Sequence, residues 1–337
     1  MSTMLIIYLT LGCVLTSAAA TGLALIWLRR HQVMDEPNHR SSHDRPTPRG
    51  GGLAVVPIVA LCWIALAALG AAPLGTLVAV AVAVGFAALS WRDDRSGGLP
   101  VWMRLGAQIL GILIALFFLP GAGHVFQGLL PEAADFAVTA LLWVWFVNLF
   151  NFMDGIDGIT GSETVMIGLG VTLVAVLAAE NDSGAIPLGA SIAAAALGFL
   201  VWNWQPAKLF LGDVGSIPLG FLLGWLLLGL AGSGHWAPAL ILPLYYLADA
   251  TLTLLYRMVR GRRFWEGHRE HFYQRAVQKG LSHAGVVLRI VAGNIGLVLL
   301  ALLGVIWPWI SLALALGLVV GLLVLLLRQP QTVAPLA

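Results

Sequence analysis

Four polar side chains recur at every third position where a long apolar run ends. They are Asn148, Asn151, Asp154 and Asp157. In a helix, residues at this spacing lie on adjoining parts of one surface, and the interleaved glycines let the backbone approach a ligand closely. Ionisable groups at the edge of an apolar span are costly and are typical of a functional site. The alternative is a polar helix end that only meets water, but plain solvation needs no fixed spacing.

A pair of adjacent carboxylates, Asp93 and Asp94, follows another apolar run, with Arg104 at the start of the next one. Such a pair suits proton acceptance or Mg²⁺, which binds a few carboxylates together with substrate phosphates and water. The alternative is a helix cap in which the carboxylates pair with Arg92 and Arg95.

A third polar segment, between two later apolar runs, contains Asn203, Lys208, Phe210 and Asp213. Asp213 stands between glycines at the start of an apolar run, and the N–H groups exposed at a helix start favour an anion. A single carboxylate in this position is placed as a metal ligand. The alternative is a purely structural role.

The loop at residues 34–52 is basic and rich in turn-forming residues. It contains Asn38, Arg49 and a run of three glycines, and arginine beside glycine N–H groups can hold phosphate. The alternative is a basic loop that sets topology and touches anionic lipid. His39 and His43 have a spacing seen in zinc sites, but no cysteine or HExxH context supports zinc.

The loop at residues 257–275 is the longest and most basic. His268, Arg269 and His271 are predicted to form a tight cationic cluster, and arginine makes forked contacts with phosphate. The alternative is an interfacial membrane anchor. Asp249, inside the apolar run before this loop, needs a partner, which is either structural or a substrate.

The elements that position these groups are predicted to be membrane helices. Of the 337 residues, 59% are hydrophobic and 10% are charged, whereas soluble domains carry roughly 25% charged residues. We therefore expect a single all-α, polytopic integral membrane domain over residues 1–337, with about eleven spans of bilayer length. The predicted spans are approximately residues 4–28, 53–72, 74–90, 104–120, 135–150, 162–179, 185–201, 217–232, 236–256, 286–306 and 308–327.

The positive charges predict the orientation of these spans. If the N-terminus lies outside, all 18 lysines and arginines fall in inner segments, as the positive-inside rule predicts. The C-terminus then lies inside, and every motif above lies on the cytoplasmic face.

These motifs together resemble the polyprenyl-phosphate N-acetylhexosamine-1-phosphate transferase family, also called glycosyltransferase family 4. The matches run in family order from residue 35 to residue 271. They are Asp35-x-Pro-Asn with Pro48-Arg-Gly-Gly-Gly, Asp93-Asp94, Asn148-x-x-Asn-x-x-Asp-Gly-Ile-Asp-Gly158, Asn203 with Pro206-Ala-Lys-Leu-Phe-Leu-Gly-Asp-Val-Gly-Ser216, and His268-Arg-Glu-His271.

The resemblance implies a cytoplasmic cleft in a bacterial inner-membrane protein that transfers a sugar-1-phosphate from a UDP-N-acetylhexosamine to undecaprenyl phosphate. It implies Mg²⁺ or Mn²⁺ as cofactor. We also expect membrane lipids as surroundings, a homodimer and no nucleic-acid partner.

By motif, the resemblance also assigns roles to residues. Asp93 and Asp94 serve the lipid phosphate and the metal, and Asp213 binds the metal. Asn151, Asp154 and Asp157 shape the nucleotide site. His268 and His271 face the diphosphate or the sugar. The remaining expected substrate contacts are Asn38, Arg49, Arg104, Asn148, Asn203, Lys208, Phe210 and Arg269.

One departure bears on the sugar. The last inner loop reads His-Arg-Glu-His and lacks the consecutive triple histidine of the peptidoglycan enzyme of this family. The sequence is therefore more similar to initiators of O-antigen synthesis that use small or deoxygenated sugars such as N-acetylfucosamine or N-acetylquinovosamine.

Two other classes of protein remain as alternatives. A transporter or lipid flippase also places polar residues within the membrane, but here the acidic motifs gather on one predicted face. A non-catalytic membrane scaffold would not need the complete acidic set.

Overall fold

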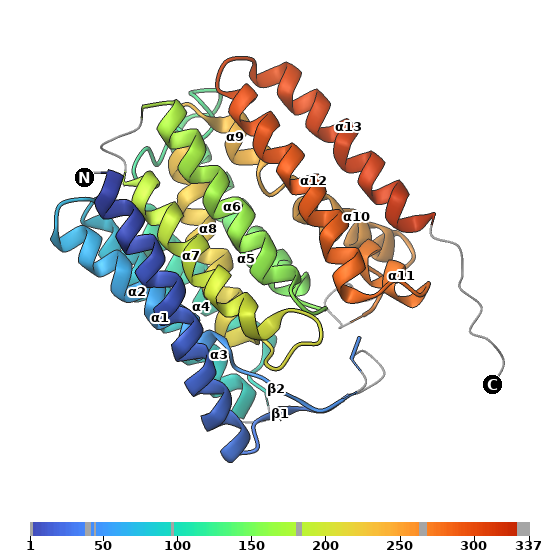
Figure 1. The fold of residues 1–337 in the computed structure, drawn as a ribbon. Helices are drawn as coiled ribbons and strands as arrows, with labels where there is room; N and C mark the ends of the chain where they lie inside the picture. The colour runs from blue at the N-terminus through green and yellow to red at the C-terminus, as the bar shows by residue number, and fades with distance from the viewer. Residues whose placement is uncertain are drawn as a thin grey trace.

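The computed structural model describes residues 3–37, 42–43, 45–95, 98–179, 184–262 and 268–328. Over these residues the chain forms a bundle of helices and one small pair of strands (Figure 1). The helices are α1 (Thr3–Arg30), α2 (Gly52–Ala68), α3 (Gly75–Arg95), α4 (Val101–Leu116), α5 (Glu132–Phe152), α6 (Ile159–Leu177), α7 (Ala185–Asn203), α8 (Asp213–Gly232), α9 (Trp236–Ile241), α10 (Leu244–Val259), α11 (Phe272–Gln278), α12 (His283–Gly304) and α13 (Pro308–Leu327).

The lengths and surfaces of these helices are those of a polytopic membrane protein. Among the described residues, eight helices are long and apolar enough to cross a membrane, and α2 and α4 are shorter apolar helices. The outward faces carry large apolar side chains, among them Leu15 on α1, Trp102 on α4 and Trp309 on α13, each about 70% exposed. Exposed apolar surface of this extent suits lipid rather than water.

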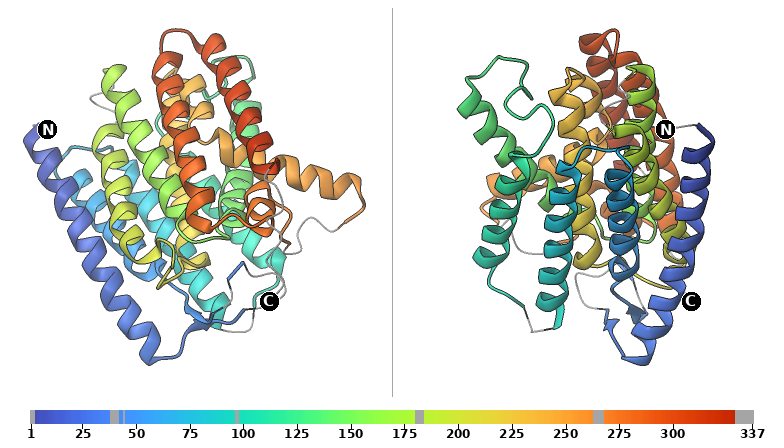
Figure 2. Two further views of the ribbon diagram at one scale, coloured as in Figure 1. Left: turned by 45° about the vertical axis from the view of Figure 1, so that its right-hand side comes forward. Right: turned by 90° about the vertical axis from the view of Figure 1, so that its left-hand side faces the viewer.

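The prediction of one span at residues 236–256 is wrong, because the chain breaks into two helices there. α9 ends at Ile241, and α10 begins at Leu244 after Pro243. Figure 2 (left) shows α10, in light orange, pointing away from the bundle. Proline lacks an N–H group and disfavours a continuous helix, although Pro57 and Pro218 lie inside unbroken helices.

α8 is the central helix of the bundle. Most of its residues are buried, and it packs against α2, α3, α5 and α9. Its glycines allow close contact with α5, since a Cβ at Gly224 would lie 2.2 Å from Trp143 Nε1. The Trp143 ring stacks on Phe221 with 4.7 Å between ring centroids. This packing holds α8, whose first residue is Asp213, against α5.

A short antiparallel ribbon modifies the all-α expectation. β1 (Met34–Asp35) pairs with β2 (Thr47–Pro48), with Met34 opposite Pro48. The ribbon follows α1, at the end of the bundle where α3 and α5 finish and α6, α8 and α12 begin (Figures 1 and 2). The described parts of the predicted inner segments therefore gather at one end of the molecule, which we call the site end.

Candidate active site

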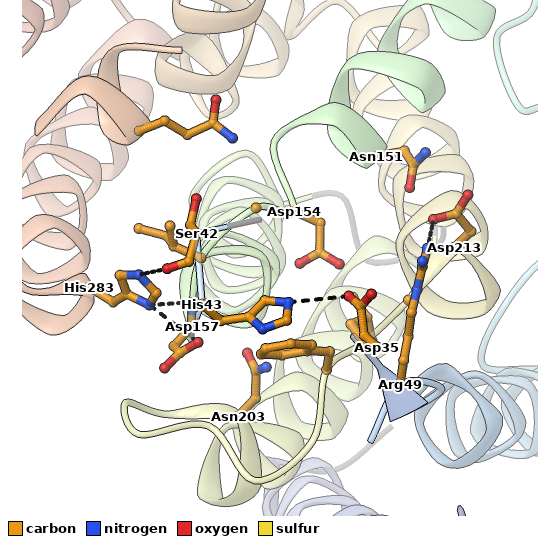
Figure 3. Close-up of a pocket in the computed structure, with 16 residues that line it drawn as sticks. Asp35, Ser42, His43, Arg49, Asn151, Asp154, Asp157, Asn203, Asp213 and His283 are labelled. Carbon is orange, nitrogen blue, oxygen red and sulfur yellow. Dashed lines mark hydrogen bonds and ion pairs between the residues drawn. The ribbon is translucent and has the colours of Figure 1, made fainter. Parts of the chain in front are cut away.

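A polar cavity of about 280 Å³ opens at the site end. Segments that lie far apart in the sequence contribute to it, and Figure 3 shows their side chains converging. Its lining residues are Asp35, Ser42, His43, Arg49, Asn151, Asp154, Gly155, Ile156, Asp157, Asn203, Phe210, Leu211, Gly212, Asp213, Gln274 and His283. The cavity thus brings together three of the predicted acidic residues, Asp154, Asp157 and Asp213.

The glycine run after Arg49 packs directly on the segment that leads into α8. The N–H groups of Gly50 and Gly51 donate to the Phe210 carbonyl over 3.0 and 2.8 Å. A Cβ at Gly52 would lie 2.3 Å from the Gly215 Cα, so only glycine permits this approach. The backbone around Arg49 is therefore held against the segment that carries Asp213.

Arg49 lies between two predicted metal ligands. Its Nη2 is 2.5 Å from Asp213 Oδ1 and 3.8 Å from Asp94 Oδ1. Burial alone would lower the pKa of Arg49, but attraction to Asp213, Asp94, Asp35 and Asp154 raises it above its usual value. The guanidinium is therefore permanently charged and balances the acidic groups around it.

Asp154 points into the cavity between His43 and Asp213 (Figure 3). Burial raises the pKa of its carboxyl from 3.8 to about 6, against the lowering effect of Thr160 and Arg49. α5 ends at Phe152, so Asp154 lies in a turn. The four polar residues therefore do not share one helical surface, because the chain leaves the helix after the second of them.

Asn151, on the last turn of α5, connects this turn to α8. Its Oδ1 accepts a hydrogen bond of 2.5 Å from the Ser216 hydroxyl, and Ser216 also donates to the Gly212 carbonyl. The amide of Asn151 is therefore held beside Asp213.

Asp157 is buried on the opposite side of the cavity. Its Oδ2 accepts from the Ala207 N–H over 3.0 Å, and its Oδ1 lies 3.2 Å from Nδ1 of His283. The other ring nitrogen of His283 lies 3.1 Å from the Ser42 carbonyl. His283 thus connects the first inner loop to the turn after α5.

A second cavity of about 430 Å³ adjoins the first and shares five lining residues with it. The shared residues are Ser42, His43, Asp157, Phe210 and His283. Beyond them the second cavity is lined mainly by polar groups such as Arg45, Thr47 and Gln205. Together the two cavities form a polar groove along the site end.

Several predicted site residues lie beside the cavity without lining it. Asp93 is buried, accepts from the Leu99 N–H and pairs with Arg104 over 3.1 Å. Asn148 donates to Gln108 over 2.7 Å. The partner of Asp93 is thus Arg104 rather than Arg92 or Arg95, and Asn148 is bonded within the protein rather than only meeting water.

The segment from Asn203 to Phe210 combines lining and structural roles. Asn203 accepts from the Gly158 N–H and donates to the Leu209 carbonyl, so it fixes the turn before α6. Phe210 lines both cavities, with its ring 4.8 Å from that of His43. Lys208 lies over the Trp202 ring at 5.4 Å and does not line either cavity.

The histidine motif of the last inner loop is held against α10. His271 is buried, with Nδ1 3.1 Å from Asp249 Oδ1. Asp249 also accepts from the N–H groups of Phe272 and Tyr273, at the start of α11. The buried carboxylate of Asp249 is therefore paired with groups of the protein itself, as in the structural alternative.

His268 contributes no charge to the predicted cationic cluster at neutral pH. Burial, followed by the nearby His271 and Arg257, lowers its pKa from 6.5 to about 4. Arg269 is exposed, and its carbonyl accepts from Gln278 over 2.7 Å. None of these three motif residues lines the two cavities. Asn38, the remaining predicted contact, lies outside the described residues.

Sequence reasoning missed His283 and gave His43, Asp35 and Gln274 no role in the site. All four line the first cavity. The available signal for His283 was a histidine directly after a helix-capping serine, Ser282, at the predicted inner end of a span. That signal is weak, because the same pattern is common at ordinary helix starts.

The donors around Arg49 fit a hard divalent cation. Asp94, Asp154, Asp213 and Asn151 offer oxygen ligands, which Mg²⁺ and Mn²⁺ prefer over nitrogen or sulfur. Among the described residues, no three acidic, histidine or cysteine side chains form a complete metal site, so a cation here would take its remaining ligands from water and substrate phosphates, as Mg²⁺ usually does. The positive charge now between Asp94 and Asp213 is that of Arg49.

The fold and the site define a class of protein: a polytopic membrane protein with an acidic, arginine-containing cavity at one end of its helices. The comparison with known families gives the class a name. Residues 76–231 match the family described as Glycosyl transferase family 4.

Curated relatives support this family. The chain is 30% identical to the probable undecaprenyl-phosphate N-acetylglucosaminyl 1-phosphate transferase of Bacillus subtilis, over 76% of this chain and 73% of the relative. It is 29% identical to the decaprenyl-phosphate N-acetylglucosaminephosphotransferase of Mycolicibacterium smegmatis, over 82% of this chain and 77% of the relative. It is also 29% identical to the phospho-N-acetylmuramoyl-pentapeptide-transferase of Latilactobacillus sakei, over 56% of this chain and 63% of the relative. The chain belongs to glycosyl transferase family 4, in the branch whose members transfer N-acetylhexosamine phosphates to polyprenyl phosphates.

Proposed function

We propose that this protein transfers an N-acetylhexosamine-1-phosphate from a UDP-sugar to undecaprenyl phosphate. An oxygen of the lipid phosphate attacks the phosphorus that bears the sugar, and the bond from that phosphorus to the bridging oxygen breaks. The products are undecaprenyl-diphospho-sugar and UMP. The named activities of the relatives support the reaction class.

The observation that carries the proposal is the convergence of Arg49, Asp94, Asp154 and Asp213 at one end of the helices. A diphosphate donor and a phosphate acceptor repel each other, so their reaction requires positive charge and oriented donors. A bound Mg²⁺ or Mn²⁺ supplies charge neutralisation at the phosphates. Asp213, Asp94 and Asn151 are the residues that would hold it.

The other cavity residues are assigned to the donor. Arg49 is suited to a forked contact with phosphate, and Asp157 and Phe210 lie where the two cavities meet. A polar acceptor beside an aromatic ring suits a nucleobase, so we assign the nucleotide to this junction. Asp93 and Arg104, beside the cavity, are assigned to positioning the lipid phosphate.

We further propose that the site faces the cytoplasm of a bacterial inner membrane and that the product initiates O-antigen or a related surface glycan. The arginine and lysine distribution supports the orientation. The His-Arg-Glu-His sequence supports a small or 6-deoxy N-acetylhexosamine as the sugar. Membrane lipids surround the helices, and a homodimer is the proposed assembly.

The test is UMP release by purified protein with Mg²⁺, undecaprenyl phosphate and a panel of UDP-sugars. We expect UMP with at least one UDP-N-acetylhexosamine, and faster release with N-acetylfucosamine or N-acetylquinovosamine donors than with N-acetylmuramoyl-pentapeptide. No UMP with any donor, from protein that remains folded, would contradict the proposed reaction. A preference for the pentapeptide donor would contradict the proposed sugar alone.

A further inference from the structure

Arg49 holds the oxygens that the proposed metal site requires. Its Nη2 contacts Asp213 Oδ1 at 2.5 Å and lies 3.8 Å from Asp94 Oδ1. Figure 3 shows the Arg49 side chain reaching Asp213 along one side of the cavity. A guanidinium and a divalent cation would bind the same carboxylate oxygens here. Two positive charges a few ångströms apart repel each other, so the two cations compete for these oxygens.

Only the side chain of Arg49 is free to respond. The backbone is held by the hydrogen bonds from Gly50 and Gly51 to the Phe210 carbonyl and by a bridge between Arg49 and Phe210. The side chain retains about a third of its full exposure, 34%, because it borders the cavity. It can therefore leave Asp213 for another anion in the same cavity without rearranging the fold.

We propose that Arg49 is an internal counter-ion: the divalent cation displaces it from Asp213 and Asp94, and the released guanidinium binds the diphosphate of the donor. The inference rests on the proposed function for the identity of the donor. The planar guanidinium can form two parallel hydrogen bonds with phosphate. These bonds to the donor replace the contacts that Arg49 loses with Asp213 and Asp94.

This exchange makes metal and donor binding cooperative. Without a donor, the cation must displace Arg49 with no new partner for the guanidinium, so metal binding is weakened. With a donor, the guanidinium gains a diphosphate, and the two ligands strengthen each other equally by thermodynamic linkage. The exchange thus disfavours a metal-loaded site that lacks a donor.

Mn²⁺ binding, measured by electron paramagnetic resonance with and without UDP, tests the exchange directly. Without UDP, we expect Arg49→Ala to bind Mn²⁺ at least tenfold more tightly than the wild type. The factor by which UDP tightens Mn²⁺ binding should fall at least tenfold in this variant. Arg45→Ala is the matched control, since it removes a positive charge from the same loop at the exposed edge of the second cavity. It should bind Mn²⁺ within about twofold of the wild type, the fold-change expected for a screened surface charge.

Equal or weaker Mn²⁺ binding by Arg49→Ala would overturn the proposal, because Arg49 would then support the metal or not affect it. A matching gain in Arg45→Ala would also overturn it, since the effect would be general electrostatics. Arg49→Gln, which keeps the length of the side chain, is judged by the same criteria if the alanine variant fails to fold. No transfer is measured, so failure of the proposed reaction and failure of this exchange are distinguishable.

Discussion

Asp154 lies in the cavity with a carboxyl pKa raised from 3.8 to about 6 by burial. Between these values the folded protein holds a proton that the unfolded chain releases. Stability therefore falls as pH rises through this window, and the full cost is present above pH 6. A charge held at such a cost is characteristic of a functional group.

Asp154→Asn should therefore raise the melting temperature in detergent at pH 7.5 while it lowers transfer. The gain should shrink as pH falls through 6 towards 4, where the wild-type carboxyl is protonated in both states. Thermal unfolding of both proteins at several pH values gives the comparison. A lower melting temperature for the variant at pH 7.5 would show that the charged carboxylate stabilises the fold.

His283 contacts Asp157 and the Ser42 carbonyl on opposite sides of its ring. Its loss should therefore loosen the junction of the two cavities. A hydrogen bond to a charged group contributes about 1.5–3 kcal/mol, so His283→Ala should lower kcat/KM about 10- to 150-fold. We expect most of this loss as a higher KM for the UDP-sugar, because His283 positions binding groups.

His124→Ala is the control for this variant, since His124 is exposed on the segment between α4 and α5. Steady-state kinetics of both variants measure kcat and the KM for the UDP-sugar. Matching kcat and KM values in the two variants would remove His283 from the site.

Sequence reasoning predicted residues that carry a motif or a regular spacing, but not residues that are placed at the cavity by tertiary contact. Asp154, Asp157 and Asp213, which line the cavity, were predicted because carboxylates beside apolar spans are costly. His283 was missed because its partner, Asp157, lies 126 positions away. His271 was predicted to face the substrate, and only the fold reveals that Asp249 lies beside it.

At the level of elements, the close contact between the start of α2 and the start of α8 joins Arg49 to Asp213. Gly52→Ala would place a Cβ 2.3 Å from the Gly215 Cα, so the two backbones must separate. We expect a lower melting temperature and a loss of transfer. Gly85→Ala, in α3 with no atom within 4 Å of the added Cβ, should be neutral or stabilise slightly, since alanine favours helix.

Melting temperature and UMP release of both glycine variants provide the measurement. Normal stability and activity in Gly52→Ala would mean that the two helix starts are not tightly joined.

The elements themselves were largely predictable, with one instructive failure. Apolar length located most of the spans, because each must bury its backbone in lipid. The break at Pro243 was not predicted, since proline also lies inside the unbroken helices α2 and α8. After the break, the first part of α10 is buried in the bundle, and its Asp249 holds the start of α11. The ribbon of β1 and β2 is too short to produce a sequence pattern.

At the scale of the whole molecule, the described parts of the predicted inner segments gather at the site end (Figure 1). The orientation of that end is a prediction from charge alone. In a protein whose two native cysteines are replaced by alanine, an impermeant maleimide on intact cells should label Leu129→Cys and miss Glu36→Cys. Both positions are exposed. The reverse pattern would place the cavity outside the cell.

The position of the acidic groups at one end of the molecule also favours the hypothesis of an enzyme over that of a transporter. A transporter places its binding groups near the midplane and opens to both sides. The two cavities described here share their lining at the site end. Chemistry on a membrane-bound phosphate therefore accounts better for the whole arrangement.

The most direct test of the central claim follows the phosphate rather than the sugar. A UDP-N-acetylhexosamine donor that supports turnover is labelled with ³²P on the phosphate attached to the sugar, and is incubated with Mg²⁺ and undecaprenyl phosphate. We predict that the label enters the lipid fraction and that UMP forms in equal amount, and that Asp213→Asn prevents both. Label retained as UDP, with sugar alone in the lipid, would show glycosyl transfer and contradict the account.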